Sequence, residues 1–206
     1  MSAAQPEGIV AVLRGHDPGQ VERAARVLAA SGIAFIEVTC TVPDAMAVIE
    51  RLRDLENAVI GCGTVINVVQ ARSALNAGAR FLVSPACIPE LVTAARQAEV
   101  PCVLGGFSPT EILRAWEAGA TQVKVFPVGR LGGPEYLRDL AGPYPTLRLM
   151  PSGGIGLDDL AAYRLPAVAS IALGGELAPA SAIASGDWDD IGRRAARALA
   201  TWAHGA

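Results

Sequence analysis

Short apolar segments alternate with longer segments of mixed polarity along the chain, and the alternation occurs eight times. Short continuous apolar runs are typical of strands that helices cover on both faces. We therefore expect eight strands, at residues 9–13, 35–39, 59–63, 81–84, 102–105, 122–126, 148–150 and 168–173.

The segments between these runs carry apolar residues at the spacing of amphipathic helices. Several of them open with a capping residue or a first-turn proline, namely Asp17-Pro18, Pro43-Asp44, Ser108-Pro109 and Asp187. We expect helices at residues 18–30, 44–55, 68–77, 88–98, 109–117, 134–140, 157–163 and 188–202.

Three of the expected helices end in a small residue followed by Gly32, Gly78 or Gly119. Glycine there adopts the left-handed conformation that ends a helix, so the repeated order of helix, glycine and buried strand indicates successive β/α units. Eight units over residues 1–206 predict one compact (β/α)8 TIM barrel domain. An open, doubly wound sheet is the alternative, but residues 13–17 do not form its glycine-rich dinucleotide fingerprint.

In such a barrel the carboxyl ends of the strands meet at one mouth, where barrel enzymes carry their chemistry. The expected strand ends supply one amine, one guanidinium, a strand carboxylate, and several hydroxyls and glycines. These mouth residues are Arg14, Glu37, Thr39, Thr41, Gly63, Thr64, Ser84, Pro85, Gly105, Gly106, Phe107, Lys124, Phe126, Pro127, Pro151, Ser152, Gly153, Gly154, Gly174, Gly175 and Glu176.

Lys124 is the only lysine among the 17 Lys and Arg residues of the chain. It lies in an apolar run, where an ammonium group is costly to bury. One explanation is a stray lysine in an arginine-rich sequence. The other is that this position uses a primary amine that can give up its proton, which arginine cannot supply.

Glu37 is likewise a charged residue in an apolar strand. A structural explanation is an internal Glu37–Lys124 ion pair, although such pairs are often no better for stability than apolar side chains. The functional interpretation is that Lys124, in low dielectric beside cationic Arg14, loses its proton readily and attacks a ketone. The resulting imine withdraws electrons from the adjacent bond, and Glu37 would move the protons.

Substrate-binding groups are less specific in the sequence. The planar guanidinium of Arg14 fits a substrate carboxylate. An arginine that forms only a structural salt bridge at the barrel rim would look the same in the sequence. Thr39, Thr41 and Thr64 could bond substrate oxygens, although threonine is ordinary in strands.

Two glycine turns follow the last two strands, Ser152-Gly153-Gly154 and Gly174-Gly175. Barrels often bind phosphate at these turns through backbone amides. Tight glycine turns that bind no ligand would have the same sequence pattern. The carboxylate of Glu176, directly after the second turn, is unfavourable for a phosphate.

Composition narrows the classes of protein further. Hydrophobic content is 51%, which suits strands buried on both faces, while a net charge of −3 provides no basic surface for nucleic acid. Apolar runs such as 165–173 are shorter than the roughly 18 residues of a membrane span. Residues 1–8 carry no secretory signal, so we expect a cytoplasmic location. Cys40, Cys62, Cys87 and Cys102 lack metal-ligand spacing, so we expect free buried thiols at strand ends in preference to a metal site or a disulfide.

Several segments, taken together, resemble one family in order and spacing over nearly the whole chain. They are 10–14, 32–39, 61–65, 83–85, 109–111, 123–127 and 151–154. The sequence is similar to the 2-dehydro-3-deoxy-phosphogluconate aldolases, a family that also includes 4-hydroxy-2-oxoglutarate aldolase. The resemblance implies a class I aldolase that is typically a homotrimer and needs no cofactor or metal beyond the covalent imine.

The implied reaction is cleavage of a 2-keto-3-deoxy sugar acid, such as 2-dehydro-3-deoxy-6-phosphogluconate, or of 4-hydroxy-2-oxoglutarate, to pyruvate and an aldehyde. Lys124 would form the imine, and Glu37 would act with a water as acid and base. Arg14 and Thr64 would bind the substrate. We expect further substrate contacts from Thr41, Pro85, Phe126, Ser152, Gly153, Gly154, Gly174 and Gly175.

Three positions depart from the family pattern. Thr41 stands where many members have an arginine for the pyruvate carboxylate, and Ser152 replaces a threonine. Glu176 stands where an uncharged residue next to a phosphate-binding serine would be expected. These residues therefore support cleavage of a 2-oxo-4-hydroxy acid better than they support binding of a phosphate group on that acid.

Two other functions remain open from the residues alone. One is a phosphate-binding barrel isomerase or epimerase that uses Glu37 as a base without an imine. The other is a non-catalytic barrel that binds a small acid or only assembles. An isomerase would survive Lys124→Arg better than an aldolase, because the charge is kept and the nucleophile is lost.

Overall fold

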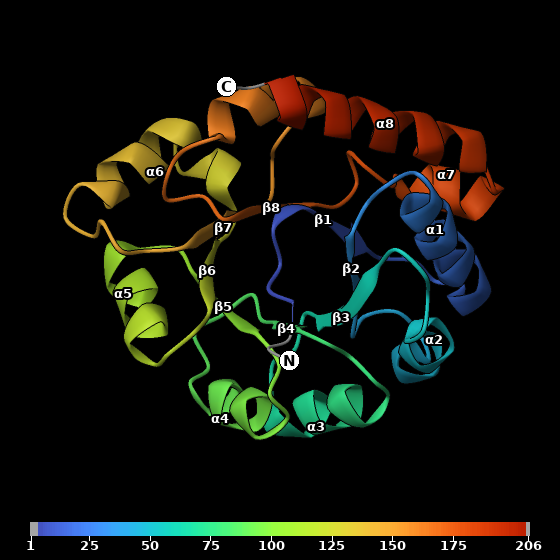
Figure 1. Ribbon diagram of the computed structural model, residues 1–206, viewed down its shortest axis with the longest axis horizontal. Helices are drawn as coiled ribbons and strands as arrows, with labels where there is room; N and C mark the ends of the chain where they lie inside the picture. The colour runs from blue at the N-terminus through green and yellow to red at the C-terminus, as the bar shows by residue number, and fades with distance from the viewer. Residues whose placement is uncertain (1–3, 205–206) are drawn as a thin grey trace.

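The computed structural model describes residues 4–204, which form a barrel of eight parallel strands inside a ring of helices (Figure 1). The predicted (β/α)8 barrel is confirmed. The predicted domain, 1–206, includes residues 1–3 and 205–206, which lie outside the described residues. The strands are β1 (Gly8–Leu13), β2 (Phe35–Thr39), β3 (Val59–Gly63), β4 (Leu82–Val83), β5 (Cys102–Gly106), β6 (Gln122–Val125), β7 (Leu149–Pro151) and β8 (Ser170–Leu173).

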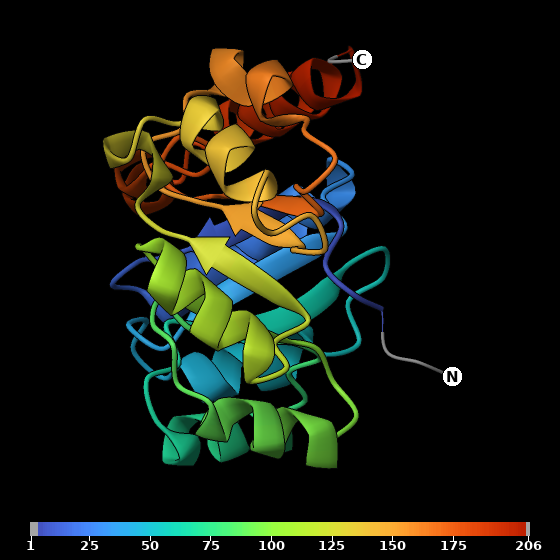
Figure 2. The same ribbon diagram turned by 90° about the vertical axis from the view of Figure 1, so that its left-hand side faces the viewer.

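Helices flank the strands on both sides in the view across the barrel (Figure 2). The α-helices are α1 (Pro18–Ala30), α2 (Ala45–Leu52), α3 (Val68–Asn76), α4 (Glu90–Gln97), α5 (Pro109–Glu117), α6 (Pro134–Ala141), α7 (Ala180–Ser185) and α8 (Trp188–His204). Two 3-10 helices, η1 (Val128–Arg130) and η2 (Leu157–Tyr163), follow β6 and β7. No helix within residues 4–204 is long and apolar enough to cross a bilayer.

The strands pair in the order β7-β6-β5-β4-β3-β2-β1-β8. Two parallel bridges, Leu149 to Val168 and Ser152 to Ala172, join β7 to β8 and close the ring. Closure brings the carboxyl ends of β6, β7, β8 and β1 next to one another. It therefore places the carboxyl end of the last strand, β8, beside the carboxyl end of the first strand, β1, at a common mouth.

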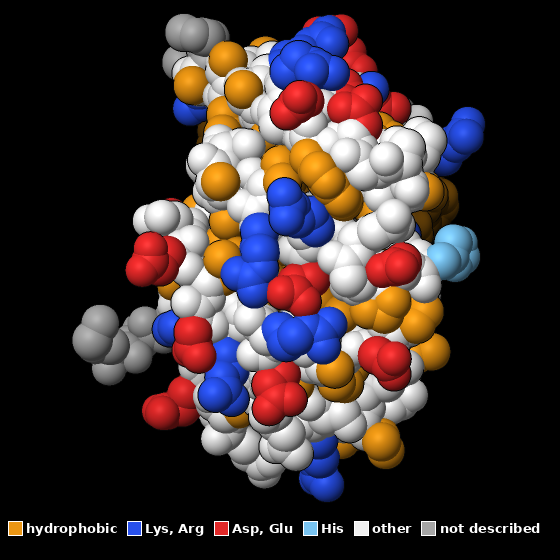
Figure 3. Space-filling view, turned by 90° about the vertical axis from the view of Figure 1, so that its right-hand side faces the viewer, with side chains coloured by type: hydrophobic (Ala, Val, Ile, Leu, Met, Phe, Trp, Pro, Cys, Tyr) orange, Lys and Arg blue, Asp and Glu red, His pale blue; other side chains and the backbone are white. Residues whose placement is uncertain are grey.

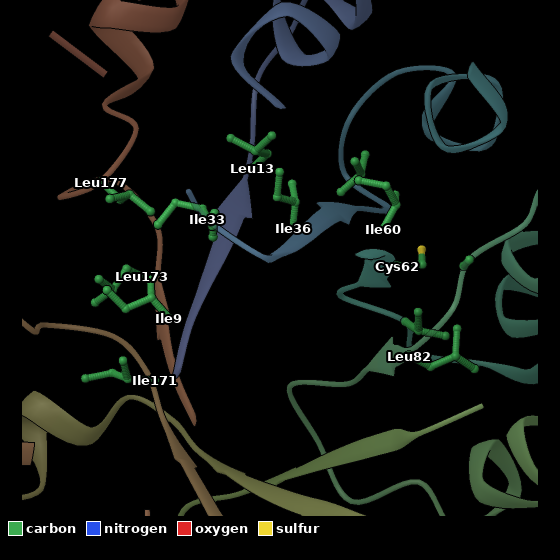
Figure 4. Packing of buried hydrophobic residues seen from close by; sticks show 14 of the residues in the cluster. Ile9, Leu13, Ile33, Ile36, Ile60, Cys62, Leu82, Ile171, Leu173 and Leu177 are labelled. Carbon is green, nitrogen blue, oxygen red and sulfur yellow. The ribbon is translucent and has the colours of Figure 1, made fainter. Parts of the chain in front are cut away.

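Alternate side chains of each strand enter two separate cores. Along β1, Ile9, Ala11 and Leu13 pack outward against the helices, and Figure 4 shows this outer core with Ile36 of β2 and Leu173 of β8. The inner core fills the barrel with Val10, Val12, Phe35, Phe81, Val83, Val103, Met150 and Ala172. Each fully buried aliphatic or aromatic side chain contributes about 1.5–3 kcal/mol, so both cores are major sources of stability.

A polar cluster closes the end of the barrel opposite the mouth. Buried Gln122, at the start of β6, donates from Nε2 to the carbonyl of Pro6. Ser170 Oγ, at the start of β8, donates to Gln122 Oε1 at 2.6 Å. These bonds tie two strands and the segment before β1 together across the barrel.

Three of the four predicted helix starts are confirmed. Asp17 Oδ1 accepts from Gln20 N at 2.9 Å, Asp187 caps α8 in the same way, and Ser108 forms a reciprocal capping box with Glu111. The start at Asp44 was predicted wrongly. Asp44 has a left-handed backbone, with φ 51°, and makes no capping bond with its side chain, so α2 begins one residue later.

The expected helix-ending glycines have the required backbone. Gly32, Gly78 and Gly119 have φ of 95°, 98° and 93°. Two elements differ from the prediction. Residues 157–163 form a 3-10 helix where a helix was predicted, and the helix α7 was not predicted.

Acidic and basic side chains are interspersed on the face that α1 and α2 cover (Figure 3). Glu22 on α1 bonds Arg26 at 2.8 Å and Arg51 of α2 at 2.6 Å. Hydrogen bonds from these two arginines hold the pKa of Glu22 below its ordinary value. The three residues thus link neighbouring helices, although partly exposed pairs contribute only about 0–1 kcal/mol each.

The four cysteines are free thiols, as expected. Cys62 and Cys102 are buried, whereas Cys40 and Cys87 are half-buried. The Sγ atoms of Cys40 and Cys62, from the ends of β2 and β3, lie 3.4 Å apart.

Candidate active site

Lys124 points into the mouth end of the barrel from β6, and its side chain is only 4% exposed. Its neighbour in the register on β5 is Gly105. A Cβ at Gly105 would lie 2.2 Å from the backbone of Pro85, so the chain passes close behind the lysine at this point. The amine nitrogen lies 5.7 Å from the ring centroid of Phe126, within the range of a cation–π contact.

Glu37 approaches Lys124 from β2 on the other side of the barrel. The distance from Lys124 Nζ to Glu37 Oε1 is 4.0 Å, too long for a hydrogen bond. Both carboxylate oxygens are buried, and neither has a hydrogen-bond partner among the described residues. A structural ion pair would have better geometry than this, since buried charges are stable only when well hydrogen-bonded.

Gly63 makes room for this carboxylate. A Cβ at Gly63, on the neighbouring strand β3, would lie 1.7 Å from Glu37 Oε1. Burial raises the pKa of Glu37 above its ordinary value, and the charges of Lys124 and Arg14 oppose that rise. A carboxyl group with a raised pKa and no fixed partner is suited to taking up and returning protons.

A cavity of about 510 Å³ opens above Lys124 at the mouth. Eight of the predicted site residues line it, and they come from the ends of β1, β6, β7 and β8. They are Arg14, Lys124, Phe126, Ser152, Gly153, Gly154, Gly174 and Gly175. The remaining lining residues are Val12, Ile155, Gly156, Ala172, Leu173 and Glu176.

The turn after β7 has a backbone that only glycine adopts easily. Gly153 and Gly154 have φ of 83° and 74°. Gly129 N donates to Gly153 O at 2.9 Å, and a Cβ at Gly129 would lie 2.5 Å from Gly154 O, so η1 packs directly on the turn. The turn is thereby held against the cavity with its backbone exposed to a ligand.

Arg14 is exposed at the rim and is held loosely from the side of β2. Its Nη1 lies 3.5 Å from Thr41 Oγ1. Thr41 Oγ1 is 2.8 Å from Thr39 Oγ1, and Thr39 donates to the carbonyl of Leu13 at 3.0 Å. The two threonines thus connect the guanidinium to the ends of β1 and β2, but Thr41 does not itself line the cavity.

Four predicted site residues do not line the first cavity, namely Glu37, Thr41, Thr64 and Pro85. Thr64 directly follows Gly63, the glycine that packs against Glu37. Its φ of 56° is a strained backbone angle for a β-branched residue. Pro85 lines a second cavity of about 780 Å³ together with Phe107 and Arg114. Phe126 lines both cavities, so its ring forms the wall between them.

In the part of the chain that the structure describes, no group of three or more His, Cys, Asp and Glu side chains gathers as a metal site. The chemical groups at the mouth are an amine, the carboxylates of Glu37 and Glu176, a guanidinium, hydroxyl groups and backbone amides. That set can form an imine with a keto acid and move protons beside it.

The family model of KDPG and KHG aldolase matches residues 2–194. The chain belongs to the KDPG and KHG aldolase family. Aldolases break and form carbon–carbon bonds, so this member is a carbon–carbon lyase. Membership favours an imine-forming aldolase over the isomerase and the non-catalytic barrel that the residues alone left open.

Individual KDPG aldolases are similar over most of the chain. The 2-dehydro-3-deoxy-phosphogluconate aldolase of Treponema pallidum is 41% identical over 170 residues, which are 81% of this chain and 80% of the relative. That of Pseudomonas aeruginosa is 35% identical over 181 residues, 87% and 82% of the two chains. The solved KDPG aldolase of Legionella pneumophila, with pyruvate captured as a covalent carbinolamine, has a TM-score of 0.85 at 30% identity, covering 95% of this chain and 94% of its own.

The sequence missed some lining residues of this aldolase cavity. Val12 and Ala172 are small apolar strand residues with no chemical signal, and only the inward register of β1 and β8 reveals them. Glu176 did carry a signal, as a charge next to a glycine pair at a strand end, but it was not among the predicted site residues.

Proposed function

We propose that this family member cleaves 2-keto-3-deoxy sugar acids to pyruvate and an aldehyde, with Lys124 as the nucleophile. The amine of Lys124 attacks the C2 carbonyl of the substrate, and the carbinolamine loses water to give a protonated imine. The imine accepts the electron pair of the C3–C4 bond when the C4 hydroxyl loses its proton. The aldehyde leaves, C3 is protonated, and water releases pyruvate from the lysine.

Glu37 moves the protons in this sequence, acting with a water. Its carboxylate faces Lys124 at 4.0 Å and keeps both oxygens free of other bonds within residues 4–204. The two groups are not hydrogen-bonded to each other, so each can bond a substrate or a water. The raised pKa of Glu37 brings its titration closer to neutrality, where one group can serve as both base and acid.

The rest of the mouth holds the substrate. Arg14, supported by Thr41, binds the C1 carboxylate through its planar fork. Ser152 with the glycine turns receives the distal hydroxyl-bearing end through its hydroxyl and backbone amides. Thr64, Pro85 and Phe126 are the remaining proposed substrate contacts, and of these Phe126 lines the cavity.

The single observation that carries this proposal is the buried sole lysine beside an unbonded carboxylate. Replacing Lys124 with Arg keeps the charge and removes the nucleophile, so pyruvate release from 2-keto-3-deoxygluconate should fall to background. Glu50→Gln, at an exposed position on α2, is the control and should keep full activity. Turnover of a substrate by the Lys124→Arg variant at near wild-type rate would refute the imine mechanism.

We also propose a homotrimer, as the family resemblance implies, built from a single-domain chain and located in the cytoplasm. Large apolar side chains exposed near the mouth support an assembly surface: Ile66 at 55%, Val69 at 75% and Phe107 at 44%. Light scattering should give a mass of three chains of 21.2 kDa, and a single-chain mass would contradict the trimer. Cell fractionation tests the location.

A further inference from the structure

The first cavity carries a negative charge that the proposed cleavage does not use. Glu176 follows Gly174-Gly175 after β8 and lines the cavity with Lys124 and Arg14. Arg194 Nη1 donates to its backbone carbonyl at 3.0 Å, which anchors the turn to α8. Within residues 4–204, the Glu176 carboxylate forms no hydrogen bond or ion pair, so it is free to meet a ligand.

Arg14 does not neutralise this carboxylate. Strands β1 and β8 are paired, with Ala11 opposite Leu173, so Arg14 and Glu176 follow adjacent strand ends. The guanidinium nevertheless contacts Thr41, on the side of β2, and no ion pair with Glu176 forms among the described residues. The cavity therefore has separate cationic and anionic positions.

Two backbone amides lie next to the anionic position in the sequence. Leu177 N and Ala178 N both donate to Gly174 O, at 2.9 and 3.0 Å, which makes a helical turn directly after β8. The N–H groups at the start of such a turn, those of Gly175 and Glu176, have no carbonyl of the turn to bond. A Cβ at Gly175 would have no atom within 4 Å, so this backbone is open to the cavity.

Amides of this kind bind a hydroxyl oxygen and a phosphate oxygen alike, but a carboxylate distinguishes them. A hydroxyl donates a hydrogen bond to a carboxylate. A phosphate monoester cannot do so when it carries about 1.5 to 2 negative charges near pH 7, and it is repelled. Glu176 is thus the group at this end of the cavity that discriminates between the two.

We propose that Glu176 is a specificity-determining residue that selects unphosphorylated sugar acids and rejects those with a terminal phosphate. Its carboxylate accepts hydrogen bonds from the distal hydroxyl groups of a 2-keto-3-deoxy sugar acid, while the neighbouring amides bind the oxygens of the same groups. This inference rests on the proposed cleavage and names the substrate class for it.

The test compares two substrates in three proteins. Pyruvate release from 2-keto-3-deoxygluconate and from its 6-phosphate gives a ratio of kcat/KM values for the wild type, Glu176→Gln and Glu50→Gln. The wild type should prefer the unphosphorylated acid. Glu176→Gln should shift the ratio toward the phosphate by roughly tenfold or more, chiefly through KM, because a like charge is removed. Glu50→Gln removes the same charge at a distance and should leave the ratio unchanged.

A binding measurement provides a readout that does not depend on turnover. In calorimetric titrations with inorganic phosphate, Glu176→Gln should bind the ion roughly tenfold more tightly than the wild type, and Glu50→Gln should behave as the wild type. An equal phosphate affinity in all three proteins would overturn the role of Glu176.

The outcomes separate this inference from the function on which it rests. Specificity through Glu176 is overturned if the wild type cleaves both acids and prefers the phosphate, or if Glu176→Gln leaves the ratio unchanged. In either case the imine mechanism stands. If neither acid is cleaved and Lys124 forms no imine with pyruvate, the proposed function fails and this inference fails with it.

Discussion

At the scale of single residues, the space between Glu37 and Gly63 is the tightest constraint in the site. A Cβ at Gly63 would lie within 2.3 Å of three atoms of the Glu37 side chain. Glu37 is fully buried among close-packed residues, so a displaced carboxylate would have to push its neighbours aside. The glycine thus fixes the position of the carboxylate that we propose moves the protons.

Gly63→Ala should therefore displace the carboxylate from Lys124. We expect aldolase activity to fall about 100-fold, because a shift of about 1 Å at a catalytic group has that effect. Overpacking should also lower the free energy of unfolding by about 1–3 kcal/mol. Steady-state kinetics and urea unfolding measure both effects, with Gly142→Ala, which has only ordinary contacts, as control. Equal activity of the two variants would contradict the assigned position.

The raised pKa of Glu37 predicts a stability that depends on pH. Its ordinary value is 4.5, and burial raises it in the folded protein. Above pH 4.5 the unfolded chain releases this proton first, so stability falls as pH rises toward the folded pKa. Glu37→Gln removes this term. Its melting temperature relative to wild type should rise as the pH increases above 4.5, while activity falls by about 10² to 10⁴. A constant difference in melting temperature would contradict a raised pKa.

Residue types revealed the centre of the site better than its edges. Lys124 and Glu37 were identifiable because a charged side chain in an apolar strand is costly to bury unless it has a function. The structure brings the two side chains together. Pro85 was placed at the same mouth, yet it lines the second cavity because Phe126 divides the two. Rings and close backbone approaches of this kind depend on three-dimensional packing, which spacing along the chain does not encode.

At the scale of elements, the local sequence determines where a helix starts. A start is well defined where side chains hydrogen-bond the free backbone N–H groups of the first turn. Ser108 and Glu111 satisfy each other's backbone N–H groups at the start of α5. Ser108→Ala should lower the free energy of unfolding by about 1 kcal/mol. Ser73→Ala, an exposed serine within α3, is the matched control and should have little effect. Equal stabilities of both variants in urea would show that the cap is not used.

Element ends were less predictable than element order. Strand β4 is only two residues long, shorter than its apolar run of 81–84, because its ladder partners are limited to Cys62, Cys102 and Val103. Residues 157–163 have a helical pattern but form a 3-10 helix. Ladder pairing and tertiary contacts with α8 decide these ends, so the local pattern could not.

At the scale of the whole molecule, the two ends of the barrel differ in construction. The mouth is lined by glycine turns and side chains that serve the reaction. The opposite end depends on Gln122, which joins Ser170 to the carbonyl of Pro6. Polar groups buried this deeply stabilise the fold only when all of them are bonded.

Ser170→Ala should leave Gln122 Oε1 buried without a donor. We expect a loss of about 1–3 kcal/mol in the free energy of unfolding with unchanged KM, because the cluster lies far from the mouth. The exposed Ser181 on α7 provides the control variant, Ser181→Ala, which should unfold like the wild type. A lower kcat/KM without loss of stability would contradict this structural role.

The central claim is that the amine of Lys124 bonds covalently to a keto acid, and its being the only lysine makes the test direct. The protein is incubated with pyruvate and reduced with borohydride, and its peptides are analysed by mass spectrometry. We predict that the peptide containing Lys124 gains the mass of the reduced pyruvate adduct, and that Lys124→Arg gains nothing. An unmodified Lys124 peptide in the active wild type would contradict the account.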